Sequence, residues 1–206
     1  MRYSPEHKQA TRRKILDAAL TVFRREGFEG AGVDAVMAEA GLTAGGFYAH
    51  FKSKEALFAE ALVDALKNAR LIRGLEDEGT VGPQRIRNIV GKYLSPAHRR
   101  FVTRGCPMPP LLGELARQNE AVRRDFQSVL LEVVGSLAPH LAADKSQPRE
   151  DQGLALLAML IGGLSLSRAV ADEALGNRIL AACRAFIEAS PALNGDAAPA
   201  TKPPST

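Results

Sequence analysis

The chain has 206 residues, of which 46% are apolar and 24% are charged, and this composition excludes a wholly disordered protein. Only 5% of the residues are aromatic and none is Trp, so the core must be built mainly from Leu, Ala, Val and Ile. The formal net charge is +4 at pH 7, and residues 1–54 alone carry +3 of it. This distribution is typical of an anion-binding module joined to a nearly neutral body.

The cysteines and the hydropathy pattern indicate the compartment. Two cysteines, Cys106 and Cys183, are too few for a disulfide framework and fit a reducing cytosol. The first residues lack the apolar segment of a signal peptide. The stretch 153–167 has 15 residues without a charge, fewer than the roughly 20 that span a bilayer. We therefore expect a cytoplasmic protein without a membrane partner.

The first predicted element is a helix. Ser4 followed by Pro5 favours a helix start, because the hydroxyl can cap the first turn and proline fits the first helical position. Apolar residues then recur at helical spacing, which predicts one buried face. Gly27 is predicted to end this helix.

The next two predicted elements are short helices that meet at Gly41. The first covers 33–40, and the second begins after a Thr43 cap and runs to about Phe51. Glycine adopts the unusual backbone angles of a tight turn at little cost. Two short helices around such a turn are the pattern of a helix-turn-helix motif.

The remaining predicted elements are also helices, each with apolar residues spaced three and four apart. They cover residues 53–66, 84–93, 111–116, 120–137, 148–171 and 173–189. Residues 105–110 contain three prolines and are predicted to be irregular. Residues 191–206 are rich in Pro, Ala and Thr and are predicted to be a flexible tail. Without a strand pattern, the predicted class is all-α, with about nine helices.

The N-terminal part of the chain contains one continuous pattern. It consists of Ile15-Leu16-Asp17-Ala18-Ala19, Glu26-Gly27-Phe28, Ala40-Gly41-Leu42-Thr43, Gly46-Phe47-Tyr48-Ala49-His50-Phe51 and Ser53-Lys54-Glu55-Ala56-Leu57, with Phe23, Val33 and Val36. This pattern, over about residues 10–60, resembles the TetR family of bacterial transcription regulators. The resemblance implies a three-helix DNA-binding domain at 1–52, a helical ligand-binding and dimerisation domain at 53–190, and the tail at 191–206. Residues 105–117 also resemble a segment of one subgroup of that family.

The second short helix carries the predicted DNA contacts. A short helix with small residues at its start can enter the major groove, which is about 12 Å wide. Thr43 offers a hydroxyl and a backbone N–H to a phosphate, and Lys54 lies at the start of the next helix. Tyr48 and His50 offer hydrogen-bonding groups. The resemblance implies that the residues at these four positions bind the DNA backbone.

The start of this helix departs from the family pattern. Ala44, Gly45 and Gly46 have no side-chain donor or acceptor for a base edge. The glycines either let the backbone approach the bases closely or make room for Met37. Base specificity then rests partly on DNA shape, on Ala44 against a thymine methyl, or on the preceding helix, where Val33 and Asp34 are candidates.

Four basic residues precede the motif, namely Lys8, Arg12, Arg13 and Lys14. They are spread over two helical turns. Either they form an arm that contacts phosphates, or they are a solvated surface.

The run 153–167 is apolar nearly all round, which is unusual for a surface helix of a monomer. The helix is either buried inside one subunit or part of a two-fold interface, which the resemblance implies for the last two helices. The candidate interface residues are Leu160, Gly163, Leu164, Ser167, Leu180 and Phe186. A homodimer presents two recognition helices to the two half-sites of a palindromic operator.

The resemblance also implies a small-molecule effector that binds among the middle helices and releases the DNA. Candidate lining residues, each of which can equally be ordinary core, are Phe58, Leu62, Tyr93, Phe101, Cys106, Met108, Leu112, Phe126 and Met159. Few polar groups accompany them, so a hydrophobic or aromatic effector is expected. His98, Arg104 and His140 are candidate polar contacts.

Cys106 raises a second possibility, a repressor that senses oxidants or electrophiles. Arg99, Arg100 and Arg104 are close in sequence, and positive charge favours the reactive thiolate. Metal-ligand spacing and an orienting group for catalysis are missing, so no cofactor, no metal and no enzymatic activity is expected. A helical ligand-binding dimer that does not bind DNA specifically is the remote alternative.

Overall fold

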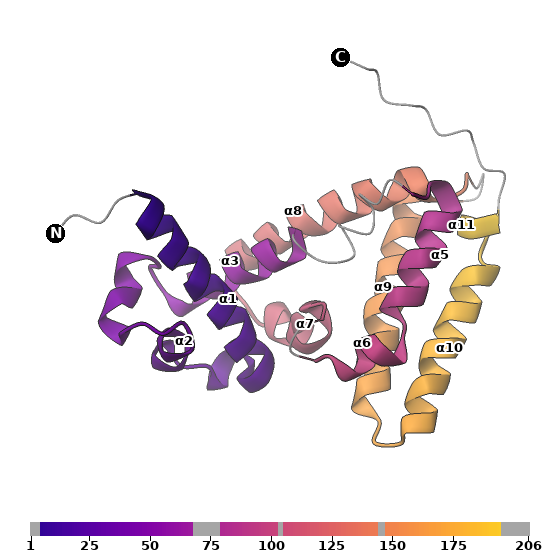
Figure 1. Cartoon of the computed structure of the whole chain (residues 1–206). Helices are drawn as coiled ribbons and strands as arrows, with labels where there is room; N and C mark the ends of the chain where they lie inside the picture. The colour runs from indigo at the N-terminus through magenta and orange to yellow at the C-terminus, as the bar shows by residue number, and fades with distance from the viewer. Residues whose placement is uncertain (1–4, 68–78, 103–104, 144–146, 195–206) are drawn as a thin grey trace, which may run out of the picture. The chain divides into compact units, whose positions relative to one another are not determined.

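The computed structural model describes residues 5–67, 79–102, 105–143 and 147–194, and every regular element in these ranges is helical (Figure 1). The described part of the chain is therefore all-α, as predicted. The chain forms two compact units, one made of Met1–Asn68 with Val102–Val129 and one made of Ala69–Phe101 with Leu130–Thr206.

The first unit is built around α1 (Pro5–Gly30), which packs on α2 (Val33–Glu39), α3 (Lys54–Lys67) and α7 (Met108–Ala116). It also contains the 3₁₀ helix η1 (Ala44–Ala49) and the first turns of α8 (Glu120–Leu137). Its core is partly aromatic: the Phe58 ring lies 5.1 Å from that of Phe23 and 5.0 Å from that of Phe28.

The second unit contains α5 (Gly82–Tyr93), α6 (Pro96–Arg100), the end of α8 and the 3₁₀ turn η2 (Ala138–His140). The long helices α9 (Arg149–Ala169) and α10 (Glu173–Ala189) follow, and α11 (Pro191–Asn194) is a single turn. α9 and α10 lie side by side, and α5 packs on both and on α11 (Figure 1).

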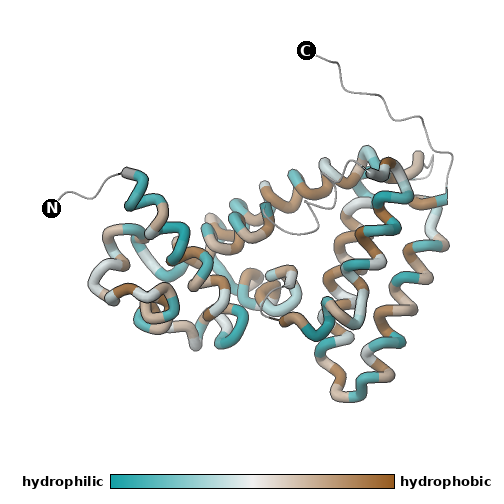
Figure 2. The backbone as a smooth tube through the Cα atoms, in the orientation of Figure 1, coloured by the Kyte–Doolittle hydropathy of each residue, from teal (hydrophilic) through white to brown (hydrophobic). Residues whose placement is uncertain are grey.

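α9 has apolar residues along most of its length (Figure 2). By length and composition alone it is a candidate membrane span, and 44% of its most apolar window is buried within the protein. The buried side packs on α10, where Cys183 Sγ lies only 2.8 Å from the point that a Cβ on Gly163 would occupy. The apolar character of α9 therefore serves internal packing on one side, which favours a core helix over a membrane span.

Two arginines tie α6 to the end of α9. Arg99 of α6 donates from Nε to the Ser167 carbonyl, at 2.7 Å, and from Nη2 to the Val170 carbonyl. Arg168 of α9 donates in return to the carbonyls of His98, at 2.7 Å, and Arg99, at 3.1 Å. Each guanidinium thus satisfies carbonyls at the carboxyl end of the other helix, which have no partner within their own helix.

Several predicted helix boundaries are confirmed by their caps. The Ser53 hydroxyl accepts from the Ala56 N–H at 3.2 Å, and the Asn119 amide oxygen accepts from the Val122 N–H at 3.1 Å. At Gly27 the backbone has φ 73° and ψ 174°, which is not helical, so the first regular helix ends there as predicted and a separate helical turn follows to Gly30. Ser4 lies outside the described residues.

Three predictions were wrong. Residues 108–110 are helical rather than irregular, because the prolines at 109 and 110 fall in the first turn of α7, where no backbone N–H is needed. α6 was not predicted, although Ser95 before Pro96 repeats the start signal of α1 and Ser95 Oγ accepts from the His98 N–H. Residues 191–194 form α11 instead of joining the flexible tail, and Leu193 is buried.

Candidate nucleic-acid interface

The turn between α2 and η1 is formed by Gly41, whose φ of 69° lies in the left-handed region that favours glycine. η1 is a 3₁₀ helix rather than the predicted α-helical segment, and the Thr43 side chain makes no capping hydrogen bond. Gly45 and Gly46 in this segment disfavour an α-helix by about 1 kcal/mol each. The Thr43 hydroxyl is therefore not used inside the motif.

η1 has one side in the core and one in solvent. The Phe47 side chain is fully buried, and its ring lies 5.9 Å from that of Phe51. Tyr48, the next residue, is 76% exposed, with its ring edge-on to Phe47 at 5.1 Å. Thr43 and Ala44 are exposed as well. The buried phenylalanine fixes the segment while the residues on either side face outward.

The two glycines of η1 are not required by internal packing. A Cβ built on Gly45 meets no atom within 4 Å. A Cβ built on Gly46 meets Met37 Cε at 3.5 Å, which is an ordinary van der Waals distance. The interpretation that Gly46 makes room for Met37 therefore loses its basis, and the close approach of DNA to the glycine pair stays a prediction.

His50 follows η1 and is half-buried. Its Nδ1 atom is buried and has no hydrogen-bond partner among the described residues. Desolvation, followed by the charges of Lys8 and Arg12, lowers the pKa of His50. Both causes favour the neutral imidazole over the charged one.

Lys54 is already engaged within the unit. Its ammonium donates to the Phe28 carbonyl at 2.9 Å and lies 4.4 Å from the centre of the Phe28 ring. A phosphate contact by this ammonium must share or replace that hydrogen bond. The sequence did not indicate this partner, which lies 26 residues away.

The basic residues of α1 differ in how far they are neutralised. Arg12 pairs with Glu60 and lies 4.4 Å from the centre of the Phe51 ring. Arg13 bonds Asp64 at 2.8 Å and pairs with Asp17. Lys8 and Lys14 are exposed, and no ion pair to them is found among the described residues. On α2, the helix before η1, Asp34 is exposed and Val33 is half-buried.

Residues 15–61 match a family model described as bacterial regulatory proteins, tetR family. This similarity to TetR-family proteins lies in the N-terminal part of the chain. The chain is 41% identical over 61 residues to YfiR, an uncharacterised HTH-type transcriptional regulator of Bacillus subtilis, and this match covers 30% of each chain. It is 39% identical over 59 residues to the regulator AcrR of Shigella flexneri, which covers 29% of this chain and 27% of AcrR. The chain therefore matches less than a third of the length of these relatives.

The similarity in fold extends beyond residues 15–61, which match the family model. The structure of Escherichia coli NemR in its reduced form superposes with a TM-score of 0.73 at 20% identity. The match covers 87% of this chain and 95% of the NemR chain. The C-terminal helices therefore share their fold with those of NemR, while the family model matches only residues 15–61.

The residues predicted to line an effector pocket fall in both units. In the first unit, Phe58, Leu62 and Met108 are buried, Cys106 and Phe126 are half-buried, and Leu112 is exposed. In the second unit, Tyr93 is buried, Met159 is half-buried and Phe101 is exposed. Met159 lines a hollow that also includes Phe186. The assignment of these residues to one effector site remains a prediction.

The polar residues predicted to contact an effector differ in their surroundings. His98 Nδ1 lies 2.8 Å from the Tyr93 carbonyl. Burial, and then the charge of Arg85, lowers the pKa of His140. Arg104 lies outside the described residues, and Arg99 is held by the carbonyls at the end of α9. Within the described ranges, no group of three or more His, Cys, Asp or Glu residues is placed to hold a metal ion.

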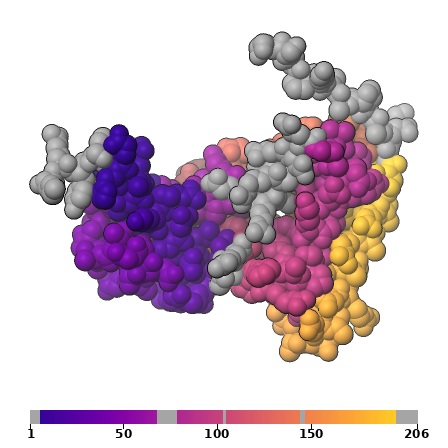
Figure 3. All heavy atoms as spheres, in the orientation of Figure 1, coloured from indigo at the N-terminus to yellow at the C-terminus, as the bar shows by residue number. Residues whose placement is uncertain are grey.

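Most of the residues predicted for the dimer interface are covered by their own chain. Leu160, Gly163, Leu164, Ser167 and Leu180 are buried, whereas Phe186 is 69% exposed. Within one chain these five pack between α9, α10 and their neighbours, and their assignment to an interface stays a prediction. The same two helices expose other apolar residues, with Leu166 at 61% and Leu175 at 41%. In the space-filling view, α10 forms a strip of surface on the second unit (Figure 3).

Proposed function

We propose that this protein is a cytoplasmic DNA-binding transcriptional regulator, and that it binds a palindromic operator as a homodimer. The observation that carries this proposal is the outward surface of η1, where Thr43, Ala44, Gly45 and Tyr48 are exposed around the buried Phe47 anchor. The surface combines hydroxyl donors with a bare backbone, so it suits phosphate contacts and close approach to a groove. His50 follows this segment, and Lys8 and Arg12 of α1 are close enough to act on its charge.

Selection of bound sequences from a random duplex pool tests this function. We expect a palindrome, with affinity that falls steeply with salt while the preference over random DNA persists. Tyr48→Ala should weaken binding to all sequences alike, since its hydroxyl is proposed to bind the backbone. Gln127→Ala, at an exposed position on α8, is the control. Selection that yields no common sequence would contradict specific DNA binding.

The glycine pair of η1 allows a sharper test of close approach. A Cβ at Gly45 meets no other atom of the protein within 4 Å, so Gly45→Ala should keep the fold. If the backbone approaches the bases, the methyl group clashes with DNA and operator affinity falls. An unchanged operator affinity with Gly45→Ala would show that the glycine has no role in approach.

We propose that the dimer forms through the exposed faces of α9 and α10, with Leu166, Leu175 and Phe186 in place of the buried residues of the same helices. Two exposed apolar helix faces on one protein suit association with a second copy. A dimer also supplies the two DNA-binding heads that a palindrome requires.

The proposed regulation is repression that a hydrophobic or electrophilic small molecule relieves. For an electrophile, Cys106 is the candidate, because Arg24 donates at 2.7 Å to the carbonyl of Gly105, one residue away. A guanidinium bonded to the carbonyl of the neighbouring residue places positive charge near the thiol, and such a charge favours the thiolate. N-ethylmaleimide, whose double bond the sulfur adds to, should release the operator complex. Cys106→Ser should abolish that release and Cys183→Ser should not; equal release from both variants would remove the electrophile hypothesis.

A further inference from the structure

A row of aromatic rings links the outward surface of η1 to α1. The ring of the exposed Tyr48 meets Phe47 edge-on, with the ring centres 5.1 Å apart, and the Phe47 ring lies 5.9 Å from that of Phe51. Phe47 and Phe51 are both buried. The Arg12 guanidinium lies over the Phe51 ring, 4.4 Å from its centre. The row therefore begins at a cation on α1 and ends at an exposed side chain of η1.

The position of η1 depends on these rings. The segment is a 3₁₀ helix of six residues, and Thr43 at its start makes no capping hydrogen bond. Its two glycines, Gly45 and Gly46, favour a helix poorly. Because so short a helix does not persist by itself, its orientation is set by the packing of Phe47 and Phe51.

Arg12 is in turn held in place by α3. Its Nη2 donates to Glu60 Oε2 at 2.6 Å, and its Nη1 pairs with Glu60 Oε1. A carboxylate that binds two guanidinium nitrogens fixes the plane of the guanidinium, and that plane can then lie over an aromatic face. A phosphate would have to compete with Glu60 for this charge. The surroundings of Arg12 therefore suit an internal role better than a phosphate contact.

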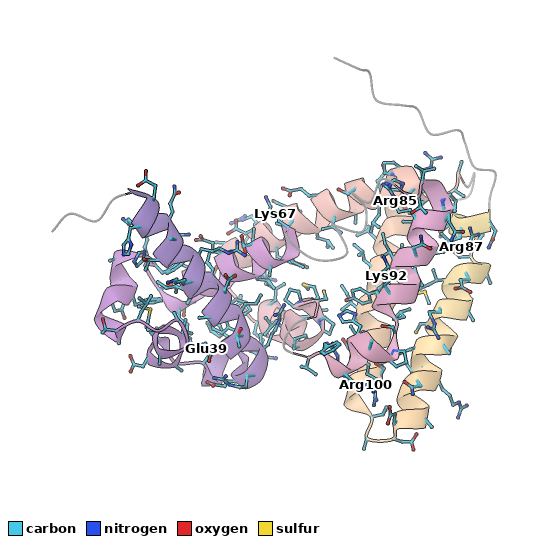
Figure 4. The ribbon with its side chains drawn as sticks, in the orientation of Figure 1. Glu39, Lys67, Arg85, Arg87, Lys92 and Arg100 are labelled. Carbon is cyan, nitrogen blue, oxygen red and sulfur yellow. The ribbon has the colours of Figure 1, made fainter. Side chains whose placement is uncertain are left out.

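Two other arginines of α1 also pair with neighbouring helices, and they allow a comparison. Arg13 bonds Asp64 of α3 at 2.8 Å. Glu39, which is labelled in Figure 4, lies at the end of α2 and pairs with Arg25. Neither Arg13 nor Arg25 lies over a ring among the described residues. The contact with the ring row, rather than an ion pair between helices, thus distinguishes Arg12.

We propose that Arg12 is a positioning residue for DNA binding, which acts through the rings of Phe51 and Phe47 on the orientation of Tyr48. This inference rests on the proposed function, in which the Tyr48 hydroxyl binds the DNA backbone. It gives Arg12 a role that differs from both a phosphate-contacting arm and a solvated surface. DNA affinity should depend on Arg12, whereas the number of phosphate contacts should not.

Fluorescence anisotropy of the full-length chain with a short mixed-sequence DNA duplex, over a salt series, tests this role. Arg12→Met keeps the aliphatic stem and loses the ring contact, so it should weaken binding about two- to fivefold. The slope of log affinity against log salt should stay unchanged. Arg13→Met is the matched control, because it also removes one positive charge and one ion pair with α3, and it should keep the wild-type affinity.

Three results of this titration would overturn the proposal. A slope smaller by about 0.9 in Arg12→Met would reveal a lost phosphate contact. Equal losses of affinity in Arg12→Met and Arg13→Met would reveal a structural ion pair without any effect of the rings. An unchanged affinity in Arg12→Met would exclude any role in DNA binding.

The link to Tyr48 can be measured without DNA. The chain has three tyrosines, and in protein labelled with 3-fluorotyrosine the ¹⁹F signal that Tyr48→Phe lacks belongs to Tyr48. Arg12→Met should shift this signal, and Arg13→Met should leave it in place. An unmoved Tyr48 signal in Arg12→Met would overturn the proposal while leaving the proposed function intact. A wild type that binds no duplex would instead remove the proposed function, and with it the role of Arg12 in DNA binding.

Discussion

The Lys54 ammonium lies between the carbonyl of Phe28, 2.9 Å away, and the face of the same residue's ring, 4.4 Å away. It thereby joins the end of α1 to the start of α3. Lys54→Met keeps the aliphatic stem and removes both interactions, so we expect a loss of about 1–2 kcal/mol of stability in urea unfolding. Lys52→Met, at an exposed position two residues earlier, should change stability by less than about 0.5 kcal/mol. Equal effects would mean that the Phe28 contact contributes nothing.

The basic residues of α1 should contribute unequally to DNA binding. Lys8 is exposed and close enough to His50 to lower its pKa, whereas Arg13 is paired with Asp17 and Asp64. Lys8→Gln should reduce the slope of log affinity against log salt by about 0.9, the value for one lost phosphate contact. Arg13→Gln should leave the slope unchanged. Fluorescence anisotropy over a salt series measures both, and a larger effect from Arg13 would reverse the assignment.

Two glycines of the second unit should respond oppositely to alanine. A Cβ at Gly163 would lie 2.8 Å from Cys183 Sγ and 3.4 Å from Leu94 Cδ2, so Gly163→Ala should destabilise by about 1–3 kcal/mol. A Cβ at Gly135 of α8 meets no atom within 4 Å, so Gly135→Ala should stabilise by about 0.5–1 kcal/mol through helix propensity. Chemical unfolding of both variants measures the contrast. Similar changes in the free energy of unfolding for both variants would show that α9 and α10 move apart at Gly163 at little cost.

A charge on the exposed face of α9 or α10 should break the proposed dimer. Leu166→Glu and Phe186→Glu put a carboxylate where the exposed fractions are 61% and 69%. Sedimentation should show monomers for both, together with a loss of affinity for the palindrome. Leu131→Glu, at a 54% exposed position on α8, is the matched control and should remain dimeric. Dimers of all three variants would contradict the proposed interface.

Acidification should destabilise the fold through His140. Burial and the charge of Arg85 lower the pKa of His140 below its ordinary value of about 6.5. The unfolded chain therefore binds the proton more readily, and stability falls as the pH drops below about 6.5 through the lower pKa of the folded state. His140→Gln should reduce this loss in a series of thermal melts, and His50 should account for part of the remainder. A variant with the wild-type pH dependence would exclude His140.

Local signals made much of the first unit predictable. The caps at Ser53 and Asn119 and the turn at Gly41 depend on neighbours in sequence, and the structure has all three. The partner of Lys54 and the buried state of Leu160 depend on segments far along the chain. Apolar spacing identifies the residues that will be buried, but it does not say whether the same chain or a second copy buries them.

The exchange of bonds between Arg99 and Arg168 has a consequence for how the second unit opens. α6 has five residues, too few to persist as a helix by itself. Its last carbonyls are held by α9, while those of α9 are held by α6. Neither end can unravel without releasing the other, so the amide protons of both ends should exchange with solvent at one shared rate. The five-residue helix α6 thus opens only when the end of α9 opens.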